Sequence, residues 1–145
     1  MKYSKATNYA LHTMVFLTLA PKGKAIGVEP LAKMQDLSPT YLSKILTKLV
    51  KAGLIESTPG AKGGYTILKK KEDISFLDVI QAVEGQTHLF RCSLAHDSFM
   101  SHEDCLIEQV MQDVETKMQE TLSQKRLVDI ASQIEQTEKN PFFKM

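Results

Sequence analysis

The sequence predicts a mainly α-helical fold with one small β-hairpin, arranged as a winged helix-turn-helix followed by a long C-terminal helix. Three stretches indicate this fold: a capped amphipathic helix between residues 38 and 53, a glycine-rich hairpin directly after it, and a long apolar repeat near the C-terminus. Ser38 suits an N-cap, Pro39 a first helical position and Gly53 a left-handed C-terminal cap. The apolar residues of this helix recur at the i, i+3, i+4, i+7 spacing of a buried face and are Leu42, Ile45, Leu46 and Leu49.

The charge of the chain is divided between its two halves. The formal net charge of the 145 residues is only +1, but residues 1–72 hold twelve Lys/Arg and four Asp/Glu, whereas residues 73–145 hold six and thirteen. These balances of +8 and −7 indicate that the N-terminal half meets a polyanion and the C-terminal half does not. No apolar run reaches the ~18 residues of a membrane span, so we expect a cytoplasmic protein without a membrane partner.

The N-terminal half is predicted to begin with three helices. Apolar spacing and the breakers Pro21 and Gly23 predict a first helix over residues 4–20, and a second, short helix is expected over residues 28–34. A tight turn joins it to the helix that starts at Ser38, which is the helix-turn-helix arrangement. In that motif the second helix of the pair lies in the major groove of DNA, with its N-terminal residues nearest the bases.

The outward face of this recognition helix carries hydrogen-bonding side chains and cations but no acid. Such a face suits contacts to base edges and phosphates of double-stranded DNA. Lys5, near the start of the first helix, is a further candidate phosphate contact, because a cation there otherwise opposes the helix dipole. The outward residues of the recognition helix are Thr40, Tyr41, Ser43, Lys44, Thr47, Lys48 and Lys51.

A β-hairpin is predicted immediately after the recognition helix. Residues 54–57 and 65–68 flank the sequence TPGAKGG and have the composition of strands. Glycines permit positive φ and allow the backbone to approach a partner closely, although they also simply make the turn. A helix-turn-helix followed by such a hairpin is a winged helix, and its candidate DNA-contacting residues are Gly60, Lys62, Gly63 and Gly64.

The C-terminal half is predicted to contain one short and one long helix. Ser75 suits the N-cap of a helix over residues 76–83. A helix of ~30 residues near the end of a small chain has little of its own domain to pack against, so we expect it to pair with a second copy of the chain. The expected parts are a winged helix-turn-helix (1–85), a cysteine-containing sensor loop (86–104), a dimerisation helix (105–134) and a flexible tail (135–145).

Over about residues 1–134 the chain resembles the Rrf2 family of bacterial winged-helix repressors. The matching stretches are residues 9–11, 38–42, 48–55, 63–65 and 75–80. The resemblance implies a homodimer built on the long C-terminal helix, which binds an imperfect DNA palindrome with its recognition helices in the major groove and its wings in the minor groove. It also implies a wing tip at residues 60–64 and these groove-facing residues: Ser38, Thr40, Tyr41, Ser43 and Lys44.

Two positions depart from the pattern of that family. Family wings usually begin with an arginine before the glycines, where this chain has Pro59. Lys62 is then expected to supply the minor-groove cation, although lysine fits a narrow groove less well than arginine does. Some family members carry a glutamate in the recognition helix where this chain has Ser43, so we expect a different operator sequence.

The two cysteines, Cys92 and Cys105, leave several interpretations open. Cluster-binding family members carry three cysteines in this region, and this chain has Ser98 near the middle position. Redox chemistry of the two thiols, with His96 and His102 favouring the reactive thiolate, is the interpretation that we prefer. The alternatives are an iron–sulfur cluster completed by a histidine, a zinc site made from both cysteines and both histidines, and two ordinary thiols.

The sequence therefore predicts a dimeric transcription repressor that senses redox or nitrosative stress through Cys92 and Cys105. The alternative functions are an iron–sulfur cluster-dependent regulator and a regulator controlled by a protein partner. We expect no resident cofactor or metal unless the cluster alternative holds. No pattern in the chain supplies a catalytic pocket or an oxyanion donor, so we do not expect an enzyme.

Overall fold

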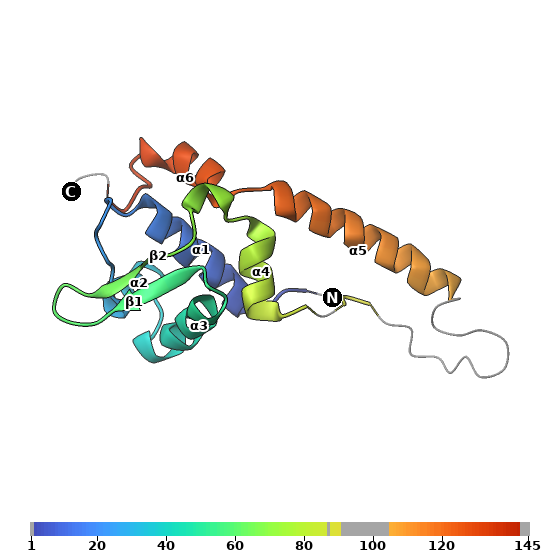
Figure 1. The fold of residues 1–145 in the computed structure, drawn as a ribbon, viewed down its shortest axis with the longest axis horizontal. Coiled ribbons are helices and arrows are strands. Elements are labelled where there is room, and N and C mark those ends of the chain that lie inside the picture. The colour runs from blue at the N-terminus through green and yellow to red at the C-terminus, as the bar shows by residue number, and fades with distance from the viewer. Residues whose placement is uncertain (1, 87, 91–104, 143–145) are drawn as a thin grey trace.

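The computed structural model describes residues 2–86, 88–90 and 105–142, and it has the predicted mainly helical fold with one hairpin (Figure 1). None of the helices that the structure describes is long and apolar enough to cross a membrane. The elements in chain order are the helices α1 (Lys5–Leu19), α2 (Val28–Met34) and α3 (Pro39–Lys51), the strands β1 (Ile55–Thr58) and β2 (Gly64–Ile67), the short 3-10 helix η1 (Lys71–Asp73), and the helices α4 (Phe76–Glu84), α5 (Leu106–Gln124) and α6 (Leu127–Glu135).

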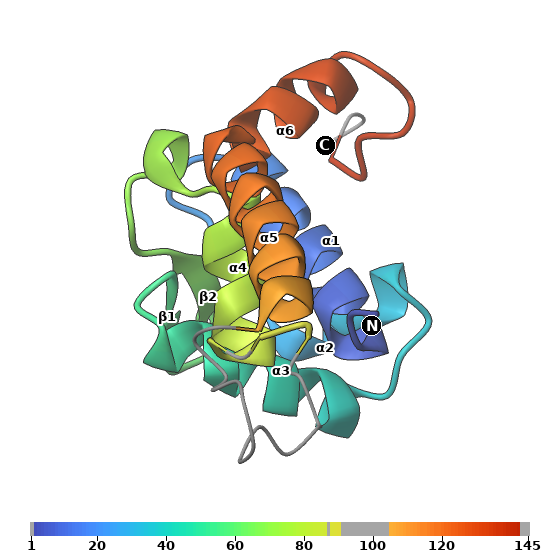
Figure 2. The same ribbon diagram turned by 90° about the vertical axis from the view of Figure 1, so that its right-hand side faces the viewer.

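Helix α1 lies at the centre of the core, where α3, α4 and α6 pack against it. In both ribbon views α3 lies at one end of this body and α6 at the opposite end, while α5 extends away from it (Figures 1 and 2). The predicted apolar face of α3 is confirmed, because all four of its residues are buried. The largest completely buried side chains include Met14, Leu31, Leu42, Leu46, Leu49, Ile55, Ile74 and Leu127.

The ends of α3 have the predicted caps. The Ser38 hydroxyl accepts a hydrogen bond of 3.1 Å from the amide of Tyr41. At the other end Gly53 has φ +76°, and the Leu54 amide donates to the carbonyl of Leu49 at 3.1 Å. Together with the bond from the Gly53 amide to the Val50 carbonyl at 3.0 Å, this forms a Schellman motif. The motif reverses the chain directly into β1, so the hairpin emerges beside α3.

The hairpin is also tied to the loop between α1 and α2. Strands β1 and β2 are antiparallel, with Ile55 opposite Ile67 and Thr58 opposite Gly64. The amide of Tyr65 donates to the carbonyl of Ile26 at 2.8 Å, and the amide of Ile26 donates back to the Tyr65 carbonyl at 3.1 Å. These two bonds add a third strand-like segment to the hairpin and fix the orientation of the wing.

The prediction of one long C-terminal helix over residues 105–134 is wrong, because the chain turns between α5 and α6. At this turn the Phe76 amide donates to the carbonyl of Lys125 at 2.8 Å, and the Leu127 amide donates to the carbonyl of Ile74 at 3.2 Å. Leu127 is completely buried in the core. The burial of Leu127 and its backbone bond to Ile74 favour the break. Helix α6 then packs along α1.

The expected flexible tail is also partly incorporated into the core. Phe142 is 8% exposed and belongs to the buried apolar cluster. Its amide donates to the side-chain oxygen of Asn140 at 2.9 Å, and the Asn140 amide group donates to the Glu135 carbonyl at 2.9 Å. The body that carries α3 therefore contains residues 127–142 as well as the N-terminal residues expected for it.

Leu127→Ala should lower the free energy of unfolding by about 2–5 kcal/mol, because it removes a completely buried side chain. Val128→Ala is the matched control, since Val128 is the half-buried neighbour of Leu127 and its truncation should cost much less. Denaturant unfolding at one fixed protein concentration measures both losses. Equal effects of the two substitutions would contradict the packing of α6 described here.

Candidate nucleic-acid interface

The outward face of α3 is exposed and free of acidic side chains. Thr40, Tyr41, Lys44 and Lys48 are exposed, and Ser43 is half-buried. Helix α3 contains no Asp or Glu, and its last turn carries Lys48 and Lys51. The structure thus presents all of the predicted α3 residues on the accessible side of the helix. This arrangement gives several donors and a positive potential on one surface, as phosphate and base contacts require.

Internal hydrogen bonds restrict three of the serine and threonine hydroxyls at this face. The Ser38 oxygen is occupied by the cap that it makes with the Tyr41 amide, so Ser38 primarily stabilises the helix start. The Ser43 hydroxyl donates to the Thr40 carbonyl at 3.0 Å, and the Thr47 hydroxyl donates to the Ser43 carbonyl at 2.8 Å. In this state Ser43 can offer a partner only its oxygen as an acceptor.

Tyr41 is oriented by an aromatic contact that the sequence did not reveal. The ring of Tyr9 on α1 meets the ring of Tyr41 edge to face, with centroids 5.9 Å apart and an interplanar angle of 89°. Such pairs are typically worth ~0.5–1.5 kcal/mol beyond the apolar area that they bury. Tyr41 remains 38% exposed, so Tyr9 holds it in place without covering it.

The wing glycines are needed by the fold itself. A Cβ at Gly63 would overlap the carbonyl oxygen of Thr58, and a Cβ at Gly64 would lie 2.5 Å from the Ile26 carbonyl carbon. Gly60 has φ +101°, which favours glycine. These three residues therefore shape the tip, while Lys62 is the exposed cation on it.

Two further lysines lie beside the wing and were not predicted as contacts. Lys22 and Lys24 are exposed in the loop between α1 and α2. They line a surface groove together with Lys62, because the hydrogen bonds between Ile26 and Tyr65 hold this loop against the hairpin. The wing thus carries more positive charge than its own sequence indicates.

The carboxylate of Glu84 fixes the N-terminal arm, which leads to Lys5, against the end of α4. One carboxylate oxygen accepts three hydrogen bonds: from the Ser4 amide at 2.8 Å, the Ser4 hydroxyl at 2.6 Å and the Thr7 hydroxyl at 2.7 Å. The hydrogen bond from the Ser4 hydroxyl is the main cause of a lowered pKa at Glu84, and the Thr7 hydroxyl and the charge of Lys48 also lower it. Lys5 is exposed in the first turn of α1.

Helix α5 has an unusual distribution of side chains. Its acidic residues Glu108 and Glu115 are buried, at 3% and 6% exposure. Its outward face is apolar, and the side chains there are 58–67% exposed: Leu106, Ile107, Val110 and Val114. An apolar stripe of this kind on a projecting helix is typical of a protein–protein contact.

Cys105 is the cysteine that the structure describes, and it lies at the N-cap of α5. Its thiol is free, and the residue is 4% exposed. Cys92, His96 and His102 lie outside the described residues. Among residues 2–86, 88–90 and 105–142 no group of three His, Cys, Asp or Glu side chains could hold a metal ion. Since iron–sulfur clusters take up to four thiolate ligands, the described residues alone, with one cysteine, do not fit a cluster.

Sequence comparisons with known proteins agree on one protein family. The sequence profile of the Rrf2 family, described as an iron-dependent transcriptional regulator, matches residues 3–133. The HTH-type transcriptional regulator YffB of Lactococcus lactis is 32% identical over 138 residues, which are 92% of this chain and 88% of YffB. The regulator NsrR of Halalkalibacterium halodurans is 28% identical over 131 residues, or 90% of each chain.

Solved structures agree with the sequence comparison. T. potens IscR matches with a TM-score of 0.73 and 25% identity, covering 95% of this chain and 91% of IscR. The oxidized form of Staphylococcus aureus CymR matches with a TM-score of 0.71 and 28% identity, covering 90% of this chain and 96% of CymR. The predicted winged-helix fold is thereby confirmed.

Glu84→Gln should destabilise the chain at neutral pH and much less in acid. The folded state lowers the pKa of Glu84, so its contribution to stability is present above the ordinary glutamate pKa of ~4.3 and is lost as the pH falls through the lowered value. Thermal unfolding of wild type and variant from pH 7 to pH 3 should show the two curves converging. Glu56→Gln, at an exposed position of β1, is the control. A gap between wild type and E84Q that does not depend on pH would contradict this assignment.

Proposed function

We propose that this chain, which belongs to the Rrf2 family of DNA-binding transcriptional regulators, is a homodimeric repressor whose DNA affinity responds to oxidation of its cysteines. The members of this family are regulators and not enzymes. The observation that supports the proposal most strongly is the acid-free outward face of α3, together with three lysines on the wing and the loop beside it.

DNA contact is proposed to combine base contacts from α3 with phosphate contacts from lysines. Thr40, Tyr41 and Ser43 lie in the first half of α3, which is the part nearest to base edges in helix-turn-helix complexes. Lys5, Lys44 and Lys48 suit phosphates, and Lys62 suits the minor groove or its edge. Ser38 contributes indirectly, because it holds the start of α3. Gly60, Gly63 and Gly64 allow the tip to come close to the backbone of DNA.

Homodimerisation is proposed to cover the apolar stripe of α5. Burying a large aliphatic side chain is worth roughly 1.5–3 kcal/mol, and four such residues point outward on this helix. A second copy of α5 offers the same stripe, as a two-fold symmetric contact requires. The pair would present two α3 helices to an imperfect palindrome.

Thiol sensing is proposed to act at the start of α5. Hydrogen peroxide would take two electrons and two protons from the Cys92 and Cys105 thiols, which then form a disulfide while the peroxide becomes two waters. Cys105 is the N-cap of α5 and almost fully buried, so its reaction requires this end of α5 to open. That opening would change how the dimer places its two α3 helices. A structural relative, CymR of Staphylococcus aureus, has been solved in an oxidized form.

Iron-dependent control is the second candidate function, because the family as a whole is described as iron-dependent. It would require ligands beyond the two cysteines of this chain. Protein purified without oxygen decides between the two candidates. Bound iron in stoichiometric amount would favour a cluster and contradict control by thiols alone.

Lys62→Ala should weaken binding to all DNA sequences and reduce the salt dependence of the affinity by about one unit of slope. Tyr41→Phe and Ser43→Ala should instead change which sequences bind, by ~1–3 kcal/mol for each lost base contact. Fluorescence anisotropy with promoter DNA and with unrelated DNA, at several salt concentrations, separates these effects. Lys139→Ala, at an exposed position after α6, is the control; an effect as large as that of Lys62→Ala would refute the placement of the DNA interface.

Val110→Glu should convert the dimer into a monomer, because it places a charge in the middle of the apolar stripe. Its control is Thr116→Glu, which adds the same charge at an exposed position of α5 outside the stripe. Analytical ultracentrifugation over a range of concentrations gives the mass of each variant. A wild-type monomer, or a Val110→Glu variant that remains dimeric, would rule out this interface.

Hydrogen peroxide should change the DNA affinity of the wild type, and dithiothreitol should reverse the change. Cys92→Ser and Cys105→Ser should each abolish the response, since a disulfide needs both thiols. DNA-binding titrations before and after oxidation, with mass spectrometry of the Cys92–Cys105 peptides, measure the effect. If both variants respond as the wild type does, oxidation acts elsewhere in the chain and the sensor proposal is wrong.

A further inference from the structure

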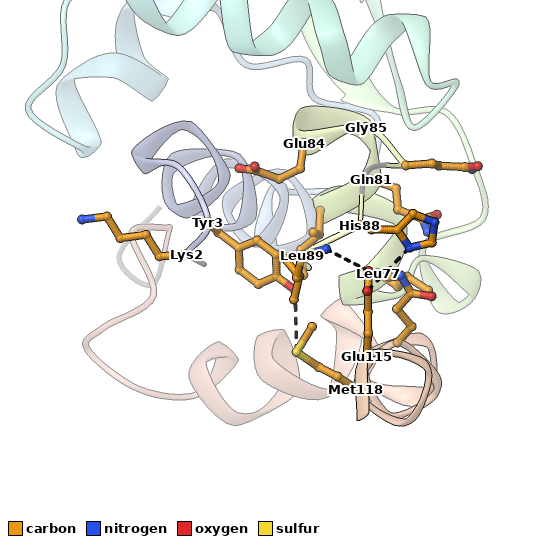
Figure 3. A pocket seen from close by; sticks show the side chains of 13 residues that line it. Lys2, Tyr3, Leu77, Gln81, Glu84, Gly85, His88, Leu89, Glu115 and Met118 are labelled. Atoms are coloured by element: carbon orange, nitrogen blue, oxygen red, sulfur yellow. Dashed lines mark hydrogen bonds and ion pairs between the residues drawn. The ribbon is translucent and has the colours of Figure 1, made fainter. Parts of the chain in front are cut away.

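A cavity of about 340 Å³ lies between the N-terminal arm, the end of α4 and the middle of α5 (Figure 3). Its walls combine an apolar part with several polar side chains. Leu77 comes from α4, Met118 comes from α5, and Leu89 lies between these helices in sequence. The volume falls at the lower end of the range of ~300–1,000 Å³ that is typical of small-molecule sites. It fits a compound of a few carbon atoms with one charged group.

The carboxylate of Glu115 forms one wall of this cavity and is incompletely satisfied. Its side chain is 6% exposed, and one oxygen accepts a hydrogen bond of 3.3 Å from the Leu89 amide. Among the described residues the other oxygen has no hydrogen-bond partner, and the half-exposed His88 imidazole lies 3.6 Å from it. A buried carboxylate with an unused acceptor is costly. Figure 3 shows this carboxylate between His88 and Leu89, on the side of the helix that faces the cavity.

The charges around the cavity favour a cation. Glu84 contributes a second carboxylate from the opposite wall. The pKa of Tyr3 is raised, first by burial of its hydroxyl and then by the negative charges of Glu84 and Glu115. Lys2 also borders the cavity, but its ammonium group points away from the other lining residues (Figure 3). The electrostatic potential inside the cavity is therefore negative at the wall that Glu115 forms.

We infer that this cavity binds a small organic ammonium compound. The ammonium group donates to the unused oxygen of Glu115 after the His88 ring turns aside, and the apolar body of the ligand packs against Leu77 and Met118. Such a charge-assisted hydrogen bond is stronger than a neutral one. A bare metal ion fits less well, because no three ligating side chains converge among the described residues.

The position of the cavity gives the ligand a means of regulation, and this part of the inference rests on the proposed function. The cavity is lined by α4 of the DNA-binding body and by α5 of the proposed dimer contact. A ligand that touches both helices restricts the angle between them. In a dimer this angle sets the spacing of the two α3 helices, so the ligand changes the affinity for a palindrome of fixed spacing.

Binding can be tested with n-butylammonium chloride on the full chain, with sodium butyrate and 1-butanol as the anionic and neutral probes of similar size. Saturation-transfer NMR and calorimetry should show saturable binding of butylammonium alone. Glu115→Gln keeps the shape and the acceptor for the Leu89 amide, and it should weaken binding about tenfold or more. Glu120→Gln removes the same charge from an exposed position on α5 and should bind as the wild type does. His88→Ala, which uncovers the carboxylate, should retain binding.

Equal responses to butylammonium and butyrate would overturn the site, as would unchanged binding by Glu115→Gln or binding of magnesium alone. DNA titrations at constant ionic strength, with and without butylammonium, then test the coupling. Saturable binding with an unchanged DNA affinity would refute the coupling and leave the site in place. A chain that binds butylammonium but no DNA would refute the proposed function instead.

Discussion

Burial of the apolar face of α3 against α1 and α4 determines which side chains the chain presents to DNA. With Leu42, Ile45, Leu46 and Leu49 inward, the helical period leaves Thr40, Tyr41, Lys44 and Lys48 outward. The Schellman motif at Gly53 then returns the chain into β1. The hydrogen bonds between Ile26 and Tyr65 hold the hairpin in one orientation. Helix and wing are thus parts of one rigid surface.

Helix α5 is anchored to the same body at its C-terminal end, and its apolar side chains point outward. The chain segment around Ile74 pairs with the turn at Lys125 and anchors the base of the helix. Two acidic side chains of α5, Glu108 and Glu115, lie inward, and four aliphatic side chains lie outward. A helix that only covers its own core shows the reverse arrangement. The two proposed inputs act at different places on α5. The thiol of Cys105 lies at its N-terminal end, and the cavity at Glu115 lies in its middle, beside α4.

Local signals made much of this structure predictable. Three of these signals each act within a few residues. They are the caps of α3, the capping box of Ser75 with Asp78 and the hairpin glycines. The break before α6 depends on the distant pairing of residues 74–76 with 125–127, and its trace in the sequence is the five-residue step from Leu122 to Leu127. The contacts of Tyr9 with Tyr41 and of Glu84 with Ser4 join segments 32 and 80 residues apart, so no local pattern marks them.

In the proposed complex, two copies of the chain place two α3 helices in successive major grooves of one palindrome. Native mass spectrometry of the complex, combined with hydroxyl-radical footprinting of the promoter, tests this arrangement. We expect two chains per duplex and two protected half-sites whose centres lie about one helical turn, or a multiple of it, apart. One chain per duplex, or a single protected half-site, would contradict it.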